Sequence, residues 1–164
     1  MKNITYNRTS ACEYAKKWAL KRNLQYYNYD SLGGDCTNFI SQCIFAGSKV
    51  MNYLKQNGWY YIDGNRKSPS WTGVEFLYNF LITNKSVGPY GKIANIDEIQ
   101  SGDIAQLSFD GNTYSHSLII LDIKQRNLNQ IYIASHTYDS YYKPIAEYNY
   151  SKIRFVHIEN VRKW

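Results

Sequence analysis

The sequence has few of the features that define several protein classes. Its 164 residues include only 3 cysteines and 3 prolines, and neither a C-x-x-C pair nor a zinc-ligand spacing is present. Its apolar runs, such as residues 118–121, are far shorter than the roughly 18 residues of a membrane-spanning helix. We therefore expect no disulfide framework, no zinc site and no transmembrane segment.

The composition predicts one globular domain over residues 1–164. Hydrophobic residues make up 44% of the chain and charged residues 20%, which excludes a disordered tail or a highly charged helical rod. No repeat, low-complexity tract or linker interrupts the chain. A chain of this length can bury a core without metals or disulfides, and we expect a monomer.

The net charge of +6 is distributed unevenly. Residues 1–24 carry six basic and one acidic side chain, and residues 143–164 carry five and two, so the middle is slightly acidic. This pattern argues against a nucleic-acid cleft through the middle of the chain and favours an anionic polymer as partner. Because residues 1–24 contain no apolar signal-peptide core, either a leader has been removed or the protein is released without one.

The hydrophobic pattern predicts an α+β fold with N-terminal helices packed on a C-terminal antiparallel sheet. We expect helices near residues 10–22, 35–45 and 72–81, the second ended by Gly47, and an irregular segment at 48–70. Strands are expected near 104–109, 116–123, 130–136 and 153–158. The second and third of these read as a hairpin, followed by a loop at 138–142.

Cys36 is the candidate nucleophile. Gly33 and Gly34 permit a tight turn before it, and it falls in the first turn of a helix, where unpaired N–H groups should lower the thiol pKa. The alternative is a cysteine that merely packs at a helix start. We interpret Cys43, two turns further along the same helix, and Cys12, on the apolar face of the first helix, as core residues. A thiolate also needs a base.

His116 and His136 are the candidate partners of that cysteine. His116 begins one strand of the expected hairpin and His136 ends the next. A turn centred near Arg126 would place them opposite each other, with Cβ atoms roughly 5 Å apart, whereas a one-residue change would put them on opposite faces. His157 lies in an apolar strand and is expected to be structural.

Aromatic residues between the cysteine helix and the sheet are candidates for substrate contact. Trp59 and Trp71 have side chains that suit stacking on sugars or peptides. The alternative for Trp71 is that it anchors the third helix to the core.

The ordered blocks Asp35–Gln42, Ser101–Leu107, Ser115–Ser117 and Ser135–Thr137 resemble the bacterial family called the putative amidase domain. That family is similar to the Nlp-type and CHAP cell-wall peptidases, which share a papain-like fold. The resemblance covers about residues 10–158.

The resemblance implies specific roles. Cys36 would be the nucleophile, with its backbone N–H in the oxyanion hole, and His116 the general base. His136 would be the orienting residue, a position that Asn, Asp, Glu or His fills in relatives. Asp35 and Asn38 would belong to the substrate-binding region, although Asn38 can instead hold the loop in place.

The chemistry implied is hydrolysis of a peptidoglycan amide through a thioester, without metal or cofactor, by an extracellular or wall-associated protein. Two other functions stay open: a non-catalytic module that binds wall polymer or sugar, and a cysteine protease or amidase toxin that acts on proteins. Nucleic-acid binding ranks below these because no recognised motif is present.

Overall fold

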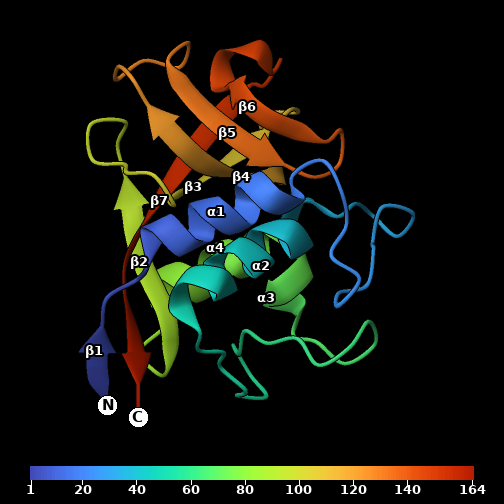
Figure 1. The fold of residues 1–164 in the computed structure, drawn as a ribbon, viewed down its shortest axis with the longest axis vertical. Helices are drawn as coiled ribbons and strands as arrows, with labels where there is room; N and C mark the ends of the chain where they lie inside the picture. Colours follow the sequence, from blue (N-terminus) through green and yellow to red (C-terminus); the bar gives the residue numbers. More distant parts are fainter.

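The chain folds into helices that pack against one antiparallel sheet (Figure 1). The computed structural model describes residues 1–164. The helices are α1 (Arg8–Trp18), α2 (Cys36–Ser48), α3 (Pro69–Thr72), α4 (Val74–Thr83) and the short 3-10 helix η1 (Ile145–Glu147). The strands are β1 (Lys2–Ile4), β2 (Gly88–Ala94), β3 (Ile104–Ser108), β4 (Tyr114–Ile123), β5 (Ile131–Ser135), β6 (Ser140–Pro144) and β7 (Lys152–Lys163). This is the predicted α+β class.

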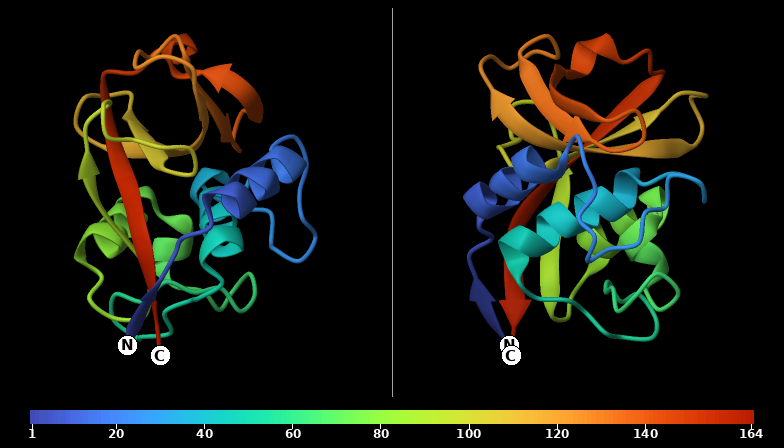
Figure 2. Two further views of the ribbon diagram at one scale, coloured as in Figure 1. Left: turned by 60° about the vertical axis from the view of Figure 1, so that its left-hand side comes forward. Right: turned by 45° about the vertical axis from the view of Figure 1, so that its right-hand side comes forward.

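The seven strands are joined through the long strand β7. The order along the sheet is β1-β7-β3-β4-β5-β6, and β2 also pairs with β7. The first residues of β7 pair with β3 and its last residues with β1, each in antiparallel register. β7 therefore runs the length of the molecule, and the two chain ends lie side by side (Figures 1 and 2).

Strand β4 is buried on both faces, which explains its unbroken apolar run at 118–121. Ile119 belongs to a core that the sheet shares with the helices. Leu118 and Ile120 belong to a second core among β3, β4, β5 and β7. Because side chains alternate along a strand, covering both faces requires apolar residues at successive positions.

The helix ends differ from the sequence prediction by a few residues. α1 begins after Asn7, whose side-chain oxygen accepts a hydrogen bond from the Ser10 backbone N–H at 2.9 Å, so Asn7 and not Ser10 is the N-cap. Gly47 lies inside α2 and does not end it. A Cβ there would lie 2.6 Å from the Tyr6 ring, so this glycine permits close packing.

The predicted hairpin of β4 and β5 is present, but its predicted register was wrong by one residue. Ile119 pairs with Ala134 and Ile120 with Ile133, and the register shifts again at a bulge before Asp122. Extended to the start of β4, this pairing does not place His116 opposite His136. The shift instead puts Ser135 on the same face as His116.

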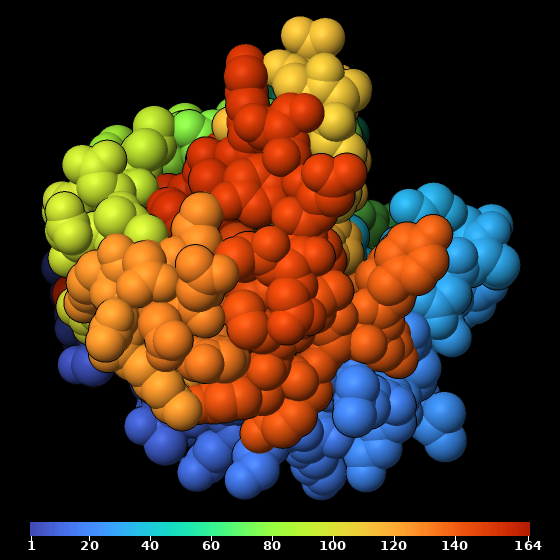
Figure 3. Space-filling model, turned by 90° about the horizontal axis from the view of Figure 1, so that it is seen from above, coloured from blue at the N-terminus to red at the C-terminus, as the bar shows by residue number.

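The segment after His136 was expected to be a loop, yet most of it forms an edge strand. A turn at 136–139 reverses the chain and β6 then pairs with β5. Seen from above, the β5–β6 region covers the top of the molecule, beside the loop that follows α1 (Figure 3). That loop and this turn meet next to the start of α2.

Candidate active site

Cys36 is the first residue of α2, where the chain turns sharply into the helix. Gly34 has φ +104°, and a Cβ on it would lie 3.0 Å from the Thr137 Oγ1 atom, so the turn favours glycine. The backbone N–H of Cys36 has no hydrogen-bond partner in the protein. This N–H group is therefore available to a negatively charged oxygen at the positive end of the helix.

Strand β4 holds the Cys36 side chain from the opposite side. Thr37 Oγ1 lies 3.0 Å from Ser117 Oγ, which joins the start of α2 to the start of β4. The Ser117 and Thr37 backbone N–H groups both donate to the Cys36 sulfur and lower its pKa. Because Ser117 follows His116 directly, this contact brings the thiol to the strand that carries the candidate base.

Burial dominates the electrostatics of the thiol, contrary to the predicted low pKa. Cys36 is 7% exposed, and burial raises the pKa of its thiol more than the two N–H groups lower it. The charge of the neighbouring Asp35 raises the Cys36 pKa further. The resting side chain is thus a neutral thiol that needs a base to take its proton.

Ser135 holds the ring of His116. His116 Nε2 lies 3.0 Å from Ser135 Oγ. The same hydroxyl lies 2.7 Å from the His136 carbonyl and 3.3 Å from the Ser117 carbonyl. Carbonyls only accept, so the single hydroxyl proton goes to one of them and Ser135 Oγ accepts from His116 Nε2–H. This leaves His116 Nδ1 with a free lone pair.

His116 is neutral at physiological pH. Its burial, with a smaller effect from the charge of Lys143, lowers the pKa of His116 to about 4. Its ring also lies near two aromatic rings, with centroids 5.7 Å from that of Tyr148 and 6.3 Å from that of Phe109. Burial raises the pKa of Tyr148, with a smaller contribution from Cys36, so the phenol lies near both the thiol and the imidazole.

A neutral thiol, an imidazole with a free nitrogen and an unpaired helix N–H group are the components of nucleophilic acyl transfer. The imidazole can accept the thiol proton, and the N–H group can hydrogen-bond to a carbonyl oxygen that gains charge.

Comparison with known sequences identifies a family whose description names amide hydrolysis. The family described as a putative amidase domain matches residues 5–158. The chain belongs to this family. It is also 30% identical over 145 residues to the uncharacterized protein YhbB of Bacillus subtilis (strain 168), covering 82% of this chain. The aligned region spans 42% of that relative's length, and no solved structure matches.

Within this amidase-domain chain, His136 does not contact His116. Its Nδ1 lies 2.6 Å from Asp35 Oδ2 and its Nε2 lies 2.8 Å from the Trp18 carbonyl oxygen. The predicted orienting contact is absent because the register is shifted by one residue. Ser135 takes that position, and sequence reasoning missed it although it is the residue just before His136.

The side chains of Asp35 and Asn38 are buried and form hydrogen bonds within the protein, so they are not available to bind substrate. Each is 1% exposed. Asn38 Nδ2 donates to Asp35 Oδ1 and to the Tyr27 carbonyl, both at 2.9 Å. Trp71 Nε1 donates to Asn38 Oδ1 at 2.9 Å. The alternative interpretation, in which Asn38 fixes the loop, describes this arrangement.

Trp59 and Trp71 do not line a groove, so their predicted role in stacking on substrate was wrong. Both are 0% exposed, and their ring centroids lie 4.9 Å apart. They pack in the core that α2 shares with α3 and α4. Large aromatic rings bury the most apolar area per residue, which is why the core takes them. The partly exposed ring near the site is that of Phe109.

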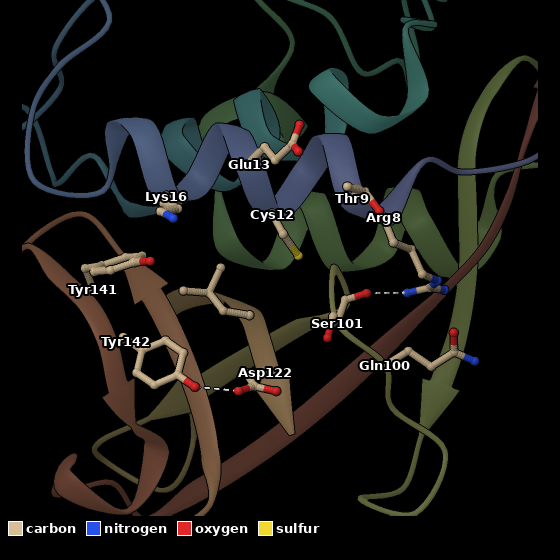
Figure 4. Close-up of a pocket in the computed structure, with 11 residues that line it drawn as sticks. Arg8, Thr9, Cys12, Glu13, Lys16, Gln100, Ser101, Asp122, Tyr141 and Tyr142 are labelled. Carbon is tan, nitrogen blue, oxygen red and sulfur yellow. Dashed lines mark hydrogen bonds between the residues drawn. The ribbon is translucent and has the colours of Figure 1, made fainter. Parts of the chain in front are cut away.

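A groove between α1 and strands β4 and β6 contains a second cysteine (Figure 4). Its volume is about 610 Å³, and Cys12, Tyr141 and Tyr142 line it. Burial raises the pKa of Cys12 to about 11, and no histidine borders the groove. This cysteine therefore lacks a base, and Cys43 is 0% exposed.

Two further observations describe the molecule as a whole. None of the helices has the length and apolar character needed to cross a membrane. No group of three or more His, Cys, Asp or Glu side chains is arranged to bind a metal ion.

Proposed function

We propose that this chain is a cysteine-dependent amidase that hydrolyses an amide bond of peptidoglycan outside the cell. The observation that carries the proposal is the His116–Ser135 hydrogen bond of 3.0 Å, which leaves Nδ1 of a neutral imidazole free on the strand whose Ser117 N–H contacts the Cys36 thiol. Membership of the amidase-domain family supports amide hydrolysis. The resemblance to cell-wall peptidases and the net charge of +6 support an anionic wall as the substrate.

The reaction begins with transfer of the Cys36 proton to His116 Nδ1, and the sulfur then bonds to the amide carbon. The carbonyl oxygen takes the negative charge and accepts a hydrogen bond from the Cys36 backbone N–H. When the C–N bond breaks, the His116 proton goes to the leaving nitrogen and a thioester remains. No metal or cofactor takes part in these steps.

Water completes the cycle. His116, neutral again, removes a proton from a water molecule that attacks the thioester carbon. The C–S bond then breaks, the acid product leaves and the sulfur takes back its proton. Ser135 keeps His116 in the same tautomer throughout, so that Nδ1 serves both halves of the reaction.

The test compares wild type, Cys36→Ser and the matched control Cys12→Ser on purified peptidoglycan, with mass spectrometry of the released fragments. We expect fragments from wild type and Cys12→Ser, and a loss of about 10³-fold or more in Cys36→Ser. The fragment masses identify the bond that is cut.

Other outcomes would contradict the proposal. Equal fragment release from all three proteins would exclude Cys36 as the nucleophile. Binding to peptidoglycan with no fragments from any variant would instead support a binding module. Hydrolysis of protein substrates but not of peptidoglycan would replace the wall substrate with a protein one.

A further inference from the structure

The buried pair of Asp35 and His136 lies directly beside the proposed nucleophile. Each side chain is 1% exposed, and the two are 2.6 Å apart between Oδ2 and Nδ1. The Tyr29 backbone N–H donates to Asp35 Oδ1 at 2.8 Å, and Asn38 donates to the same oxygen. These two donors occupy Oδ1, and Oδ2 is the oxygen that faces His136.

The contacts of His136 require a proton on both ring nitrogens. Nε2 lies 2.8 Å from the carbonyl oxygen of Trp18, which can only accept, so Nε2 carries hydrogen. Nδ1 faces the Asp35 carboxylate, another acceptor, so it also donates. Both ring nitrogens of His136 thus face acceptors, and its ring stacks on Phe39 with centroids 3.9 Å apart.

The positions of His136 and Asp35 also suit the dipoles of the two helices whose ends they contact. Trp18 is the last residue of α1, and Asp35 is the N-cap of α2. A cation at the C-terminus of one helix and an anion at the N-terminus of another are both favourable. His136 thereby links α1, α2 and the end of β5 at the start of the nucleophile helix.

The charged side chains around Asp35 include more acidic than basic groups. Arg22 Nε lies 3.6 Å from Asp35 Oδ2, but the same guanidinium binds two more carboxylates, those of Asp30 and Asp139. One arginine thus faces three acids. The titratable groups that pack around the pair are the charged or ionisable side chains of Tyr14, Arg22, Tyr29, Asp30, Cys36 and Asp139.

We propose that His136 is a positioning residue whose positive charge balances Asp35 beside Cys36 and whose two hydrogen bonds fix the turn into α2. The inference rests on the proposed function of Cys36 as nucleophile. Because the Asp35 charge raises the Cys36 pKa, loss of the balancing cation makes the thiolate harder to form. His136 acts through Asp35 and touches neither thiol nor base.

The test measures alkylation of Cys36 by iodoacetamide against pH, in a Cys12→Ser background, with mass spectrometry to assign the modified thiol. We expect His136→Gln to shift the alkylation profile upward by about one pH unit, which is roughly tenfold slower alkylation at neutral pH. The double variant Asp35→Asn/His136→Gln removes both charges and should return the profile close to that of the background protein.

Phe39→Leu is the matched control. It removes the ring stacked on His136 and leaves both charges in place. We expect it to lower the melting temperature without moving the alkylation profile. A profile that moves equally in Phe39→Leu and His136→Gln, or a double variant no better than His136→Gln, would overturn the charge-balancing role.

Nitrogen-15 NMR of the wild-type imidazoles provides a readout that does not depend on any variant folding. We expect both nitrogens of His136 to be protonated at pH 7, while His116 is neutral. A neutral His136 would overturn the proposal. Alkylation and NMR need no substrate, so a failure of this inference is distinct from a failure to hydrolyse peptidoglycan.

Discussion

The two ends of the β4–β5 hairpin near α2 hold histidines in opposite surroundings. His116 faces the rings of Tyr148 and Phe109 and one hydroxyl, that of Ser135, and burial lowers its pKa to about 4. His136 is equally buried but lies between a carboxylate and a helix-end carbonyl. The comparison indicates that the partners at hydrogen-bond distance, together with burial, set the role that a buried histidine can take.

Among the variants of these two histidines and their partners, removal of the His116 imidazole should have the largest effect on activity. We expect His116→Gln to lower kcat/KM for amide hydrolysis about 10³-fold, because the thiol then has no acceptor for its proton. The fold at neutral pH should remain, since glutamine replaces a neutral side chain. Circular dichroism and thermal unfolding verify the fold, and activity above a tenth of wild type would remove His116 from the mechanism.

The pH dependence of stability should report the lowered pKa of His116. The pKa of His116 is about 4 in the folded chain against 6.5 for the free side chain. Between these values the unfolded chain binds a proton that the folded chain does not, so stability falls as the pH drops from 6.5 towards 4. The loss is about 3 kcal/mol at pH 4.

Urea unfolding at pH 7 and pH 4 measures that loss. His116→Gln should lose less stability than wild type over this interval, because its side chain does not titrate, while other groups contribute equally to both proteins. An identical pH dependence in the two proteins would mean that His116 titrates normally in the folded chain.

The smallest effect is expected at the hydroxyl that holds His116. Ser135→Ala should lower kcat/KM about tenfold, because Nε2–H then lacks its acceptor and the useful tautomer becomes less populated. Ser48→Ala, another buried serine, is the control and should keep wild-type activity. If Ser135→Ala is as active as this control, the hydrogen bond seen at Nε2 does not matter for the reaction.

Much of the fold could be predicted because its signals are local. Short apolar, β-branched runs bounded by turn residues identified the strands near 104–109 and 116–123, and helical spacing identified α2. The glycine turn before Cys36 placed that residue in the first turn of its helix, as the structure has it. Each of these patterns involves residues within a few positions of one another.

Strand β6 and the core aromatic residues lacked such signals. β6 has two exposed tyrosines, Tyr141 and Tyr142, where an interior strand would show alternation, because it lies at the sheet edge. Trp59 comes from an irregular segment, and its burial depends on α2 and α4, which come from other parts of the chain. Sequence reasoning consequently placed it on a surface.

The sequence by itself determined the candidate nucleophile and base, since a helix start and a strand start are local features at Cys36 and His116. Only the tertiary structure decided which side chains form hydrogen bonds with His116 and with His136. Side chains along a strand repeat every two residues, so a shift of one residue exchanges Ser135 for His136 beside the base. That shift depends on a bulge and on packing across the hairpin, and it places the predicted orienting histidine against Asp35 instead of His116.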